Sequence, residues 1–293
     1  MKYELARYFV AALTLLEVSF AASNFTQSHL RTRRAVVGGT AVAQGEFPFF
    51  VAVGRCGGTL ISQNRVLTAA HCICDPDRPR SSVRIGPTTQ TDGKEVPVSC
   101  ARIHPDYGKV GCDPNKAYDI AVLQLAESVT DVTFATLNTD TSIPAGSSDV
   151  TVLGFGQTTP GCYTTQVSET LNKLVYSSVS KDDCKSIKGD DFREDLRLCA
   201  ANTESTGVCF HDSGGPMLDS SGTVQYGIAV AGPESTMCAT GGDPDLYTDV
   251  AAHNAWITEQ LNDNTCDQSF HGGFREWVGE ISSGALSFLN DWV

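Results

Sequence analysis

The chain has 293 residues, which is enough for one large or two medium-sized domains with a substantial apolar core. A hydrophobic content of 41% and an aromatic content of 8% are typical of a globular protein and exclude a disordered chain. The formal net charge of −13 argues against nucleic acid and anionic membranes as partners, because both repel an acidic protein.

The first 21 residues predict a signal peptide, and hence a secreted, extracellular protein. Basic Lys2 and Arg7 precede a mostly apolar run to Phe20, which small residues follow. The alternative is an N-terminal membrane anchor, but Glu17 interrupts this run, which is too short to span a bilayer comfortably. No later segment is apolar enough to span.

A propeptide is predicted over residues 22–35. It contains the glycosylation sequon Asn24-Phe25-Thr26 and ends in the basic cluster Arg31-Thr32-Arg33-Arg34-Ala35, which is typical of processing sites. Removing residues 1–35 leaves 16 basic and 32 acidic residues, a formal charge of −16. The eleven cysteines fit an oxidising compartment, and their odd number leaves at least one without an intrachain partner.

From Phe47 to about Val250, short apolar runs alternate with Gly, Pro, Asn and Asp. This spacing favours antiparallel β-barrels or sandwiches, with strands expected near 49–53, 65–68, 120–125, 150–155 and 226–230. One helix is expected over 251–261, with Ala255, Trp256, Ile257 and Leu261 roughly on one face.

A C-terminal extension is predicted over 266–293. Its apolar residues Trp277, Ile281, Leu286, Leu289 and Trp292 form a possible stripe. Two interpretations remain: the stripe docks on the body of the protein or stays loose, or it forms a helix that binds a partner or a membrane.

Three stretches carry the chemistry. Ser213 is followed by Gly214-Gly215-Pro216, which permits a tight turn, but a serine needs a base and backbone N–H donors to act as a nucleophile. His71 ends the apolar run 66–70, and Asp119 opens another at Ile120. Taken singly, the histidine reads as structural or exposed and the aspartate as a strand cap.

Together these stretches resemble the trypsin-like (chymotrypsin-fold) serine endopeptidases. The matching motifs are Val36-Val37-Gly38-Gly39, Leu67-Thr68-Ala69-Ala70-His71-Cys72, Asp119-Ile120-Ala121-Val122-Leu123 and Asp212-Ser213-Gly214-Gly215-Pro216. The resemblance covers 36 to about 264 and implies an all-β domain over 36–265. Two six-stranded antiparallel β-barrels would pack with the active site between them, and a C-terminal helix would follow.

The resemblance also implies residue roles in peptide-bond hydrolysis through an acyl-enzyme. Ser213 would be the nucleophile, His71 the general base and Asp119 the residue that orients His71, while the N–H groups of His211 and Ser213 would form the oxyanion hole. No cofactor and no metal site are expected. The expected partners are protein or peptide substrates and protein inhibitors, and the protein is expected to be a monomer.

Activation in this family pairs a new N-terminal amine with the aspartate before the nucleophile, here Val36 and Asp212. The residue before Val36 is Ala35, so cleavage after Arg34 would leave a terminus one residue too long. Either another protease cuts after Ala35, or trimming follows, or the longer terminus fits poorly.

The resemblance places Gly207 at the base of the primary specificity pocket and Asp245 on its wall. The pair resembles the crustacean collagenase-type members, which implies broad specificity that includes Arg and Lys, because a substrate cation would relieve an unpartnered buried carboxylate. The alternative is that Asp245 is a loop carboxylate. Val230 and Gly232 match the family's substrate-pairing strand, where Val230 replaces a serine.

His211 departs from the family, which has glycine there. This departure keeps a second hypothesis open: a weakly active or inactive homologue that acts by binding or inhibiting another protein, as glucanase-inhibitor proteins of plant pathogens do. The resemblance further implies the disulfides Cys56–Cys72, Cys184–Cys199 and Cys209–Cys238. A Cys74–Cys112 bridge is a further suggestion, and Cys100, Cys162 and Cys266 stay unassigned.

Overall fold

The computed structural model describes residues 36–265, apart from 76–79, 109–111, 114, 158–160, 163–166, 190–191, 202–205, 232–236, 240 and 242. The predicted signal peptide, propeptide with its sequon, and C-terminal extension lie outside the described residues. The same holds for Gly232 and Cys266. All structural statements below concern the described part of the chain.

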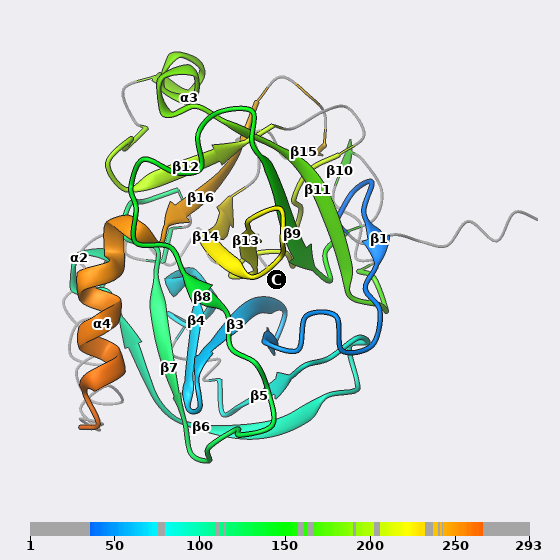
Figure 1. Ribbon diagram of the computed structural model, residues 1–293, viewed down its shortest axis with the longest axis vertical. Coiled ribbons are helices and arrows are strands. Elements are labelled where there is room, and N and C mark those ends of the chain that lie inside the picture. Colours follow the sequence, from blue (N-terminus) through cyan, green and yellow to red (C-terminus); the bar gives the residue numbers. More distant parts are fainter. Residues whose placement is uncertain are drawn as a thin grey trace, which may run out of the picture. The chain divides into compact units, whose positions relative to one another are not determined.

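The first half of the domain forms a closed antiparallel barrel (Figure 1). Its six strands follow the order β2-β3-β4-β7-β6-β5, and β5 pairs back with β2. Their bounds are β2 Phe50–Val53, β3 Cys56–Ser62, β4 Arg65–Thr68, β5 Ser82–Ile85, β6 Lys94–Ile103 and β7 Ala121–Leu125. β4 is buried along its whole length, so the strand that leads to His71 is fixed by core packing.

The second half forms another barrel of six strands, in the order β9-β11-β12-β16-β14-β13 with β13 returning to β9. Their bounds are β9 Asp149–Gly154, β11 Asn172–Val179, β12 Arg197–Ala200, β13 Pro216–Leu218, β14 Val224–Ala231 and β16 Asp245–Asp249. Short strands are added by β1 Thr40–Ala41, β8 Thr136–Leu137, and the pair β10 Gly161–Cys162 and β15 Met237–Cys238. The predicted architecture of two six-stranded barrels is confirmed.

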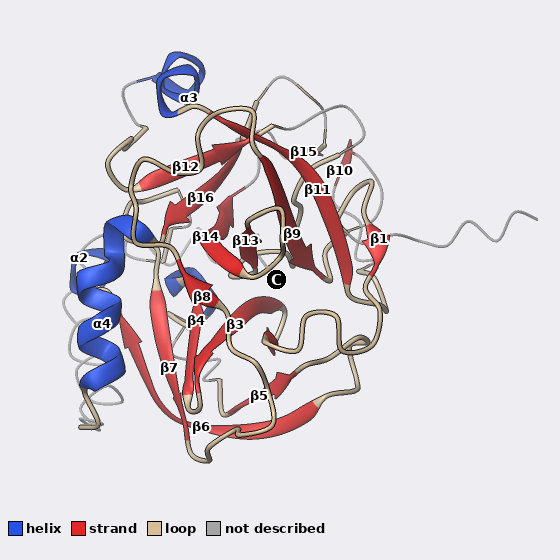
Figure 2. Ribbon diagram, in the orientation of Figure 1, coloured by secondary structure: helices blue, strands red, loops and turns tan. Residues whose placement is uncertain are grey.

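Helices are few and peripheral (Figure 2). The helix expected over 251–261 begins as a 3₁₀ turn, η3 Ala251–His253, and continues as α4 Asn254–Asn262. Helices α2 Pro105–Gly108 and α3 Lys181–Lys188 were not predicted. Helix α3 buries only Cys184 and is defined by its cap instead, because the Ser180 hydroxyl accepts from the Asp183 N–H at 3.1 Å. No described helix is long and apolar enough to cross a membrane.

Disulfides fasten the loops around the barrels. The three bridges implied by the resemblance are confirmed, and the suggested Cys74–Cys112 bridge is present as well. Cys100 is also disulfide-bonded.

Candidate active site

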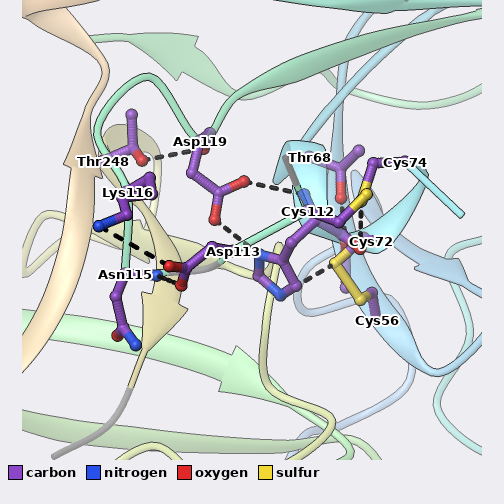
Figure 3. Close-up of polar contacts among 12 residues, drawn as sticks. Cys56, Thr68, Cys72, Cys74, Cys112, Asp113, Asn115, Lys116, Asp119 and Thr248 are labelled. Carbon is purple, nitrogen blue, oxygen red and sulfur yellow. Dashed lines mark hydrogen bonds and ion pairs between the residues drawn. A yellow bond between two sulfur atoms is a disulfide. The ribbon is translucent and has the colours of Figure 1, made fainter. Parts of the chain in front are cut away.

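His71 and Asp119 form a preorganised pair. His71 lies on the 3₁₀ turn η1 Ala70–Cys72, directly after β4, and the Cys56–Cys72 bridge ties this turn to β3. Asp119 is fully buried, and its carboxylate accepts from the His71 backbone N–H at 2.9 Å and lies 2.6 Å from His71 Nδ1 (Figure 3). A bond to Nδ1 fixes the tautomer and leaves Nε2 free to take a proton.

Ser213 is brought to this pair from the second barrel. Its carbonyl accepts from the Gly57 N–H of β3 at 2.8 Å, so the serine loop is tied to the first barrel. A Cβ on Gly214 would lie 3.3 Å from the Cys72 sulfur, which itself lies 3.7 Å from His71 Nε2. Within the described residues no hydrogen bond joins Ser213 to His71, as is common where such contacts tighten only with substrate bound.

His211 occupies the third position of a tight turn. The Asp212 N–H donates to the Cys209 carbonyl at 3.0 Å, and His211 has a φ of 76°. A positive φ at this position is the mark of a type II turn, which normally requires glycine. The Phe210 carbonyl accepts from the Gln157 N–H at 3.2 Å, which holds the central peptide of the turn. The strained conformation is therefore maintained by neighbouring contacts.

The His211 ring packs beside Arg55, an exposed residue between β2 and β3. Burial lowers the pKa of His211, and the positive charge of Arg55 lowers it further, against a hydrogen bond to the Arg55 backbone that raises it. A neutral imidazole is the expected form near pH 7.

Asp212 is a buried carboxylate held by backbone alone. Its two oxygens accept from the N–H groups of Gly156 and Cys209, each at 2.8 Å. Burial raises the pKa of Asp212 to about 7, an effect that these two bonds oppose and the charge of Asp245 reinforces. Such a site favours either a proton or a positively charged partner.

The segment that begins at Val36 lies in the core of the second barrel. Val36 and Val37 are buried, Val37 bridges to Gly207, and the Val36 carbonyl accepts from the Gly39 N–H at 2.7 Å. Within the described residues no hydrogen bond joins Val36 to Asp212. Val36 has a φ of 48°, an unfavourable value for a β-branched residue.

The residues expected at the specificity pocket are placed as follows. Gly207 is buried beside Val37, and Val230 is buried in β14. Asp245 is fully buried, and it already accepts hydrogen bonds from the Val208 N–H at 2.8 Å and the Tyr176 hydroxyl at 3.3 Å. The idea that its carboxylate lacks a partner in the free protein is therefore wrong, because protein groups solvate it.

Two glycines beside Asp212 were not predicted from the sequence. A Cβ would lie 1.9 Å from an Asp212 carboxylate oxygen at Gly154 and 2.3 Å from one at Gly156, so only glycine leaves room for this carboxylate. The signal was the Gly-Phe-Gly sequence at the end of β9, since paired glycines at a strand end mark a close approach.

Cys56, His71 and Cys72 place their ligand atoms within 4.8 Å of one another. The two sulfurs are joined in a disulfide, so they are not available as metal-binding thiolates. This cluster does not fit a metal ion.

Comparison with known proteins gives consistent matches. The family model described as Trypsin matches residues 36–257. Trypsin iota of Drosophila melanogaster is 32% identical over 216 residues, covering 71% of this chain and 79% of the relative. Chymotrypsin-like elastase family member 1 of Macaca fascicularis is 32% identical over 260 residues, covering 82% and 94%. Neuropsin, a serine protease expressed in the limbic system of mouse brain, matches structurally with a TM-score of 0.66 and 25% identity, covering 76% of this chain and 99% of that chain.

Proposed function

The chain belongs to the trypsin family and is a serine endopeptidase that acts on protein substrates, and from this premise we propose that it is a secreted zymogen that works through Ser213, His71 and Asp119. The observation that carries the proposal is the buried Asp119 bonded to both the backbone N–H and Nδ1 of His71. The secretory signal and the disulfides support an extracellular location.

In the proposed mechanism, Ser213 Oγ attacks the scissile carbonyl while His71 Nε2 takes its proton. Asp119 stabilises the imidazolium that forms, and His71 then returns the proton to the leaving amine. A water molecule hydrolyses the acyl-enzyme by the same route. The N–H groups of His211 and Ser213 bind the tetrahedral oxyanion, and loss of one such donor costs about 3 kcal/mol of barrier.

Activation would proceed by cleavage before Val36. Among the described residues no cation pairs with the buried Asp212 carboxylate, and the new α-amino group would supply one. Ionisation of Asp212 would then fix the Cys209–Asp212 turn. The unfavourable φ of Val36 supports cleavage of the Ala35–Val36 bond, because this torsion angle no longer exists once Ala35 is removed.

The primary specificity proposed for the enzyme is broad. Gly207 offers no charge at the base of the pocket, and Asp245 is the acidic group close by. Because Asp245 already accepts two hydrogen bonds, its attraction for a substrate Arg or Lys is weaker than that of a bare carboxylate. Cleavage after both apolar and basic residues is therefore expected.

The test is hydrolysis of a peptide library by protein that starts at Val36, with Ser213→Ala as the control. The proposal predicts cleavage after both classes of residue that disappears in the control. Cleavage only after apolar residues would show that Asp245 does not contribute to the specificity pocket. No cleavage by folded protein would favour the second candidate, a binding protein with weak or no catalysis, for which the strained His211 is the specific observation.

A further inference from the structure

The segment of residues 115–119, which carries Asp119, is not stabilised by regular secondary structure. None of them belongs to a helix or a strand, and Tyr118 has a φ of 63°, a left-handed value that bulky residues avoid. The Tyr118 ring is held by packing, stacked on His104 at a centroid distance of 4.8 Å with the Arg193 guanidinium 6.0 Å from its centre. The position of Asp119 therefore depends on contacts from outside the segment.

Two side chains of the second barrel hold the ends of this segment. The Arg197 Nη2 donates to the Lys116 carbonyl, and the Thr248 Oγ1 donates to the Asp119 carbonyl at 2.9 Å (Figure 3 draws the second contact). Arg197 in β12 and Thr248 in β16 are direct partners across the antiparallel ladder. Their side chains thus leave the same face of the sheet about 5 Å apart.

Both side chains are buried, Arg197 to 3% and Thr248 to 1% exposure. Burial of a guanidinium is costly, so it persists only where partners repay the lost hydration. Burial lowers the pKa of Arg197, whereas the negative charge of Asp119, and after it that of Asp113, raises it. The cation thus lies in the field of the active-site carboxylate.

The Asp119 carboxylate itself is oriented only by His71 among the described residues. Among the described residues, its two carboxylate oxygens accept only from the backbone N–H and Nδ1 of His71 itself. Any drift of the 116–119 backbone would therefore carry the Asp119 carboxylate away from His71, which β4 and the Cys56–Cys72 bridge hold in place.

We propose that Arg197 is a positioning residue for the catalytic aspartate: together with Thr248 it clamps the Lys116 and Asp119 carbonyls to the second barrel, which also carries Ser213. The clamp fixes Asp119 relative to His71 and to the nucleophile across the boundary between the barrels. The inference rests on the proposed function, because it assigns the clamp a role in that reaction. A misplacement of about 1 Å at such a site costs on the order of 10²-fold in rate.

The test measures kcat and KM per titrated active site, in protein that starts at Val36. Arg197→Met is expected to lower kcat by about 10- to 100-fold with KM changed less than about 2-fold. Arg197→Lys restores part of kcat, because an ammonium also donates to a carbonyl. Thr248→Val lowers kcat as well, and the double variant loses less than the product of the two single losses, since both act on one segment.

Arg65→Met is the matched control. Arg65 is likewise buried, at the end of β4 away from His71, and it donates to the backbone carbonyls of Gln260 in α4 and of Asp263 just after it. None of its described hydrogen bonds reaches residues 115–119. It is expected to lower Tm while leaving kcat per active site within about 2-fold. An unchanged kcat in Arg197→Met, or an equal loss in Arg65→Met, would overturn the proposal. Should Arg197→Met fail to fold, Thr248→Val and Arg197→Lys carry the same test.

A second measurement separates this proposal from the proposed function. In Ser213→Ala protein, the proton between His71 Nδ1 and Asp119 is expected to give a far-downfield NMR signal, as strong charge-assisted hydrogen bonds do. Adding Arg197→Met should broaden or shift this signal, whereas adding Arg65→Met should not. If the wild type is inactive but the NMR signal changes only with Arg197→Met, the proposed function is refuted and the clamp is supported. If the wild type is active but the signal does not change with Arg197→Met, the clamp is refuted and the proposed function is supported.

Discussion

The two halves of the active site are built in opposite ways. The His71–Asp119 pair lies on the first barrel next to a fully buried strand, and its two hydrogen bonds are already formed in the intact chain. The loop of Ser213 lies on the second barrel and combines a left-handed His211 with a buried Asp212 whose pKa is raised to about 7. The acid–base half is thus preorganised, while the oxyanion half stores strain and unsatisfied charge.

This difference indicates where regulation acts. A pair whose hydrogen bonds are already formed gains little from a new contact, whereas a strained turn beside a buried carboxylate responds strongly to one. The release of an amine at Val36 would therefore change the Ser213 loop and leave the His71–Asp119 pair as it is.

The largest effect is expected from breaking the preorganised half. Asp119→Asn keeps the shape but offers His71 Nδ1 an amide, which favours the wrong tautomer and lowers kcat by about 10⁴-fold. Steady-state kinetics on titrated enzyme measures this loss. If the variant kept more than about a tenth of the wild-type kcat, Asp119 would not be the orienting residue.

A smaller loss is expected from crowding the carboxylate in the other half. In Gly156→Ala the new Cβ lies 2.3 Å from an Asp212 oxygen, so the carboxylate must move and the turn with it. We expect kcat/KM to fall by about 10²-fold, the effect of losing an oxyanion donor. Gly189→Ala is the control, because its Cβ meets open space and only backbone strain is added. Equal kcat/KM in Gly156→Ala and the wild type would contradict this.

Removing the backbone strain at His211 should increase kcat/KM. His211→Gly removes the left-handed penalty of about 1 kcal/mol and so favours the turn that forms the oxyanion hole, which is expected to raise kcat/KM by up to about 5-fold. His211→Ala keeps the strain but removes the ring, which separates backbone strain from obstruction by the imidazole. A loss of activity in the glycine variant would show that the His211 ring contributes to substrate binding.

The last prediction concerns stability rather than activity. Because the pKa of Asp212 is raised in the folded precursor, its contribution to stability is complete below about pH 3.8 and is lost as pH rises to about 7. The Tm of the Ser213→Ala precursor should therefore fall over this range more than that of the same precursor with Asp212→Asn. Parallel curves for the two proteins would mean that Asp212 is not a buried titrating group.

Much of this comparison was predictable from the sequence, and part was not. The motifs around His71, Asp119 and Ser213 identify the site because each requires particular residue types in a short stretch. Arg197, Thr248 and the two partners of Asp245 depend on contacts between residues 37 to 129 positions apart, which local patterns do not contain. Helix α3 lacks an apolar face of any length, so periodicity misses it.

The central claim is that the Ser213 half awaits the Val36 amine while the His71–Asp119 half does not. The most direct measurement is the rate of fluorophosphonate labelling before and after cleavage of a precursor whose residues 30–35 are replaced by a site that releases Val36. We expect the precursor to be labelled slowly, the labelling rate to rise strongly on cleavage, and Ser213→Ala protein not to be labelled. Equal labelling rates before and after cleavage, or no labelling of the folded cleaved protein, would contradict it.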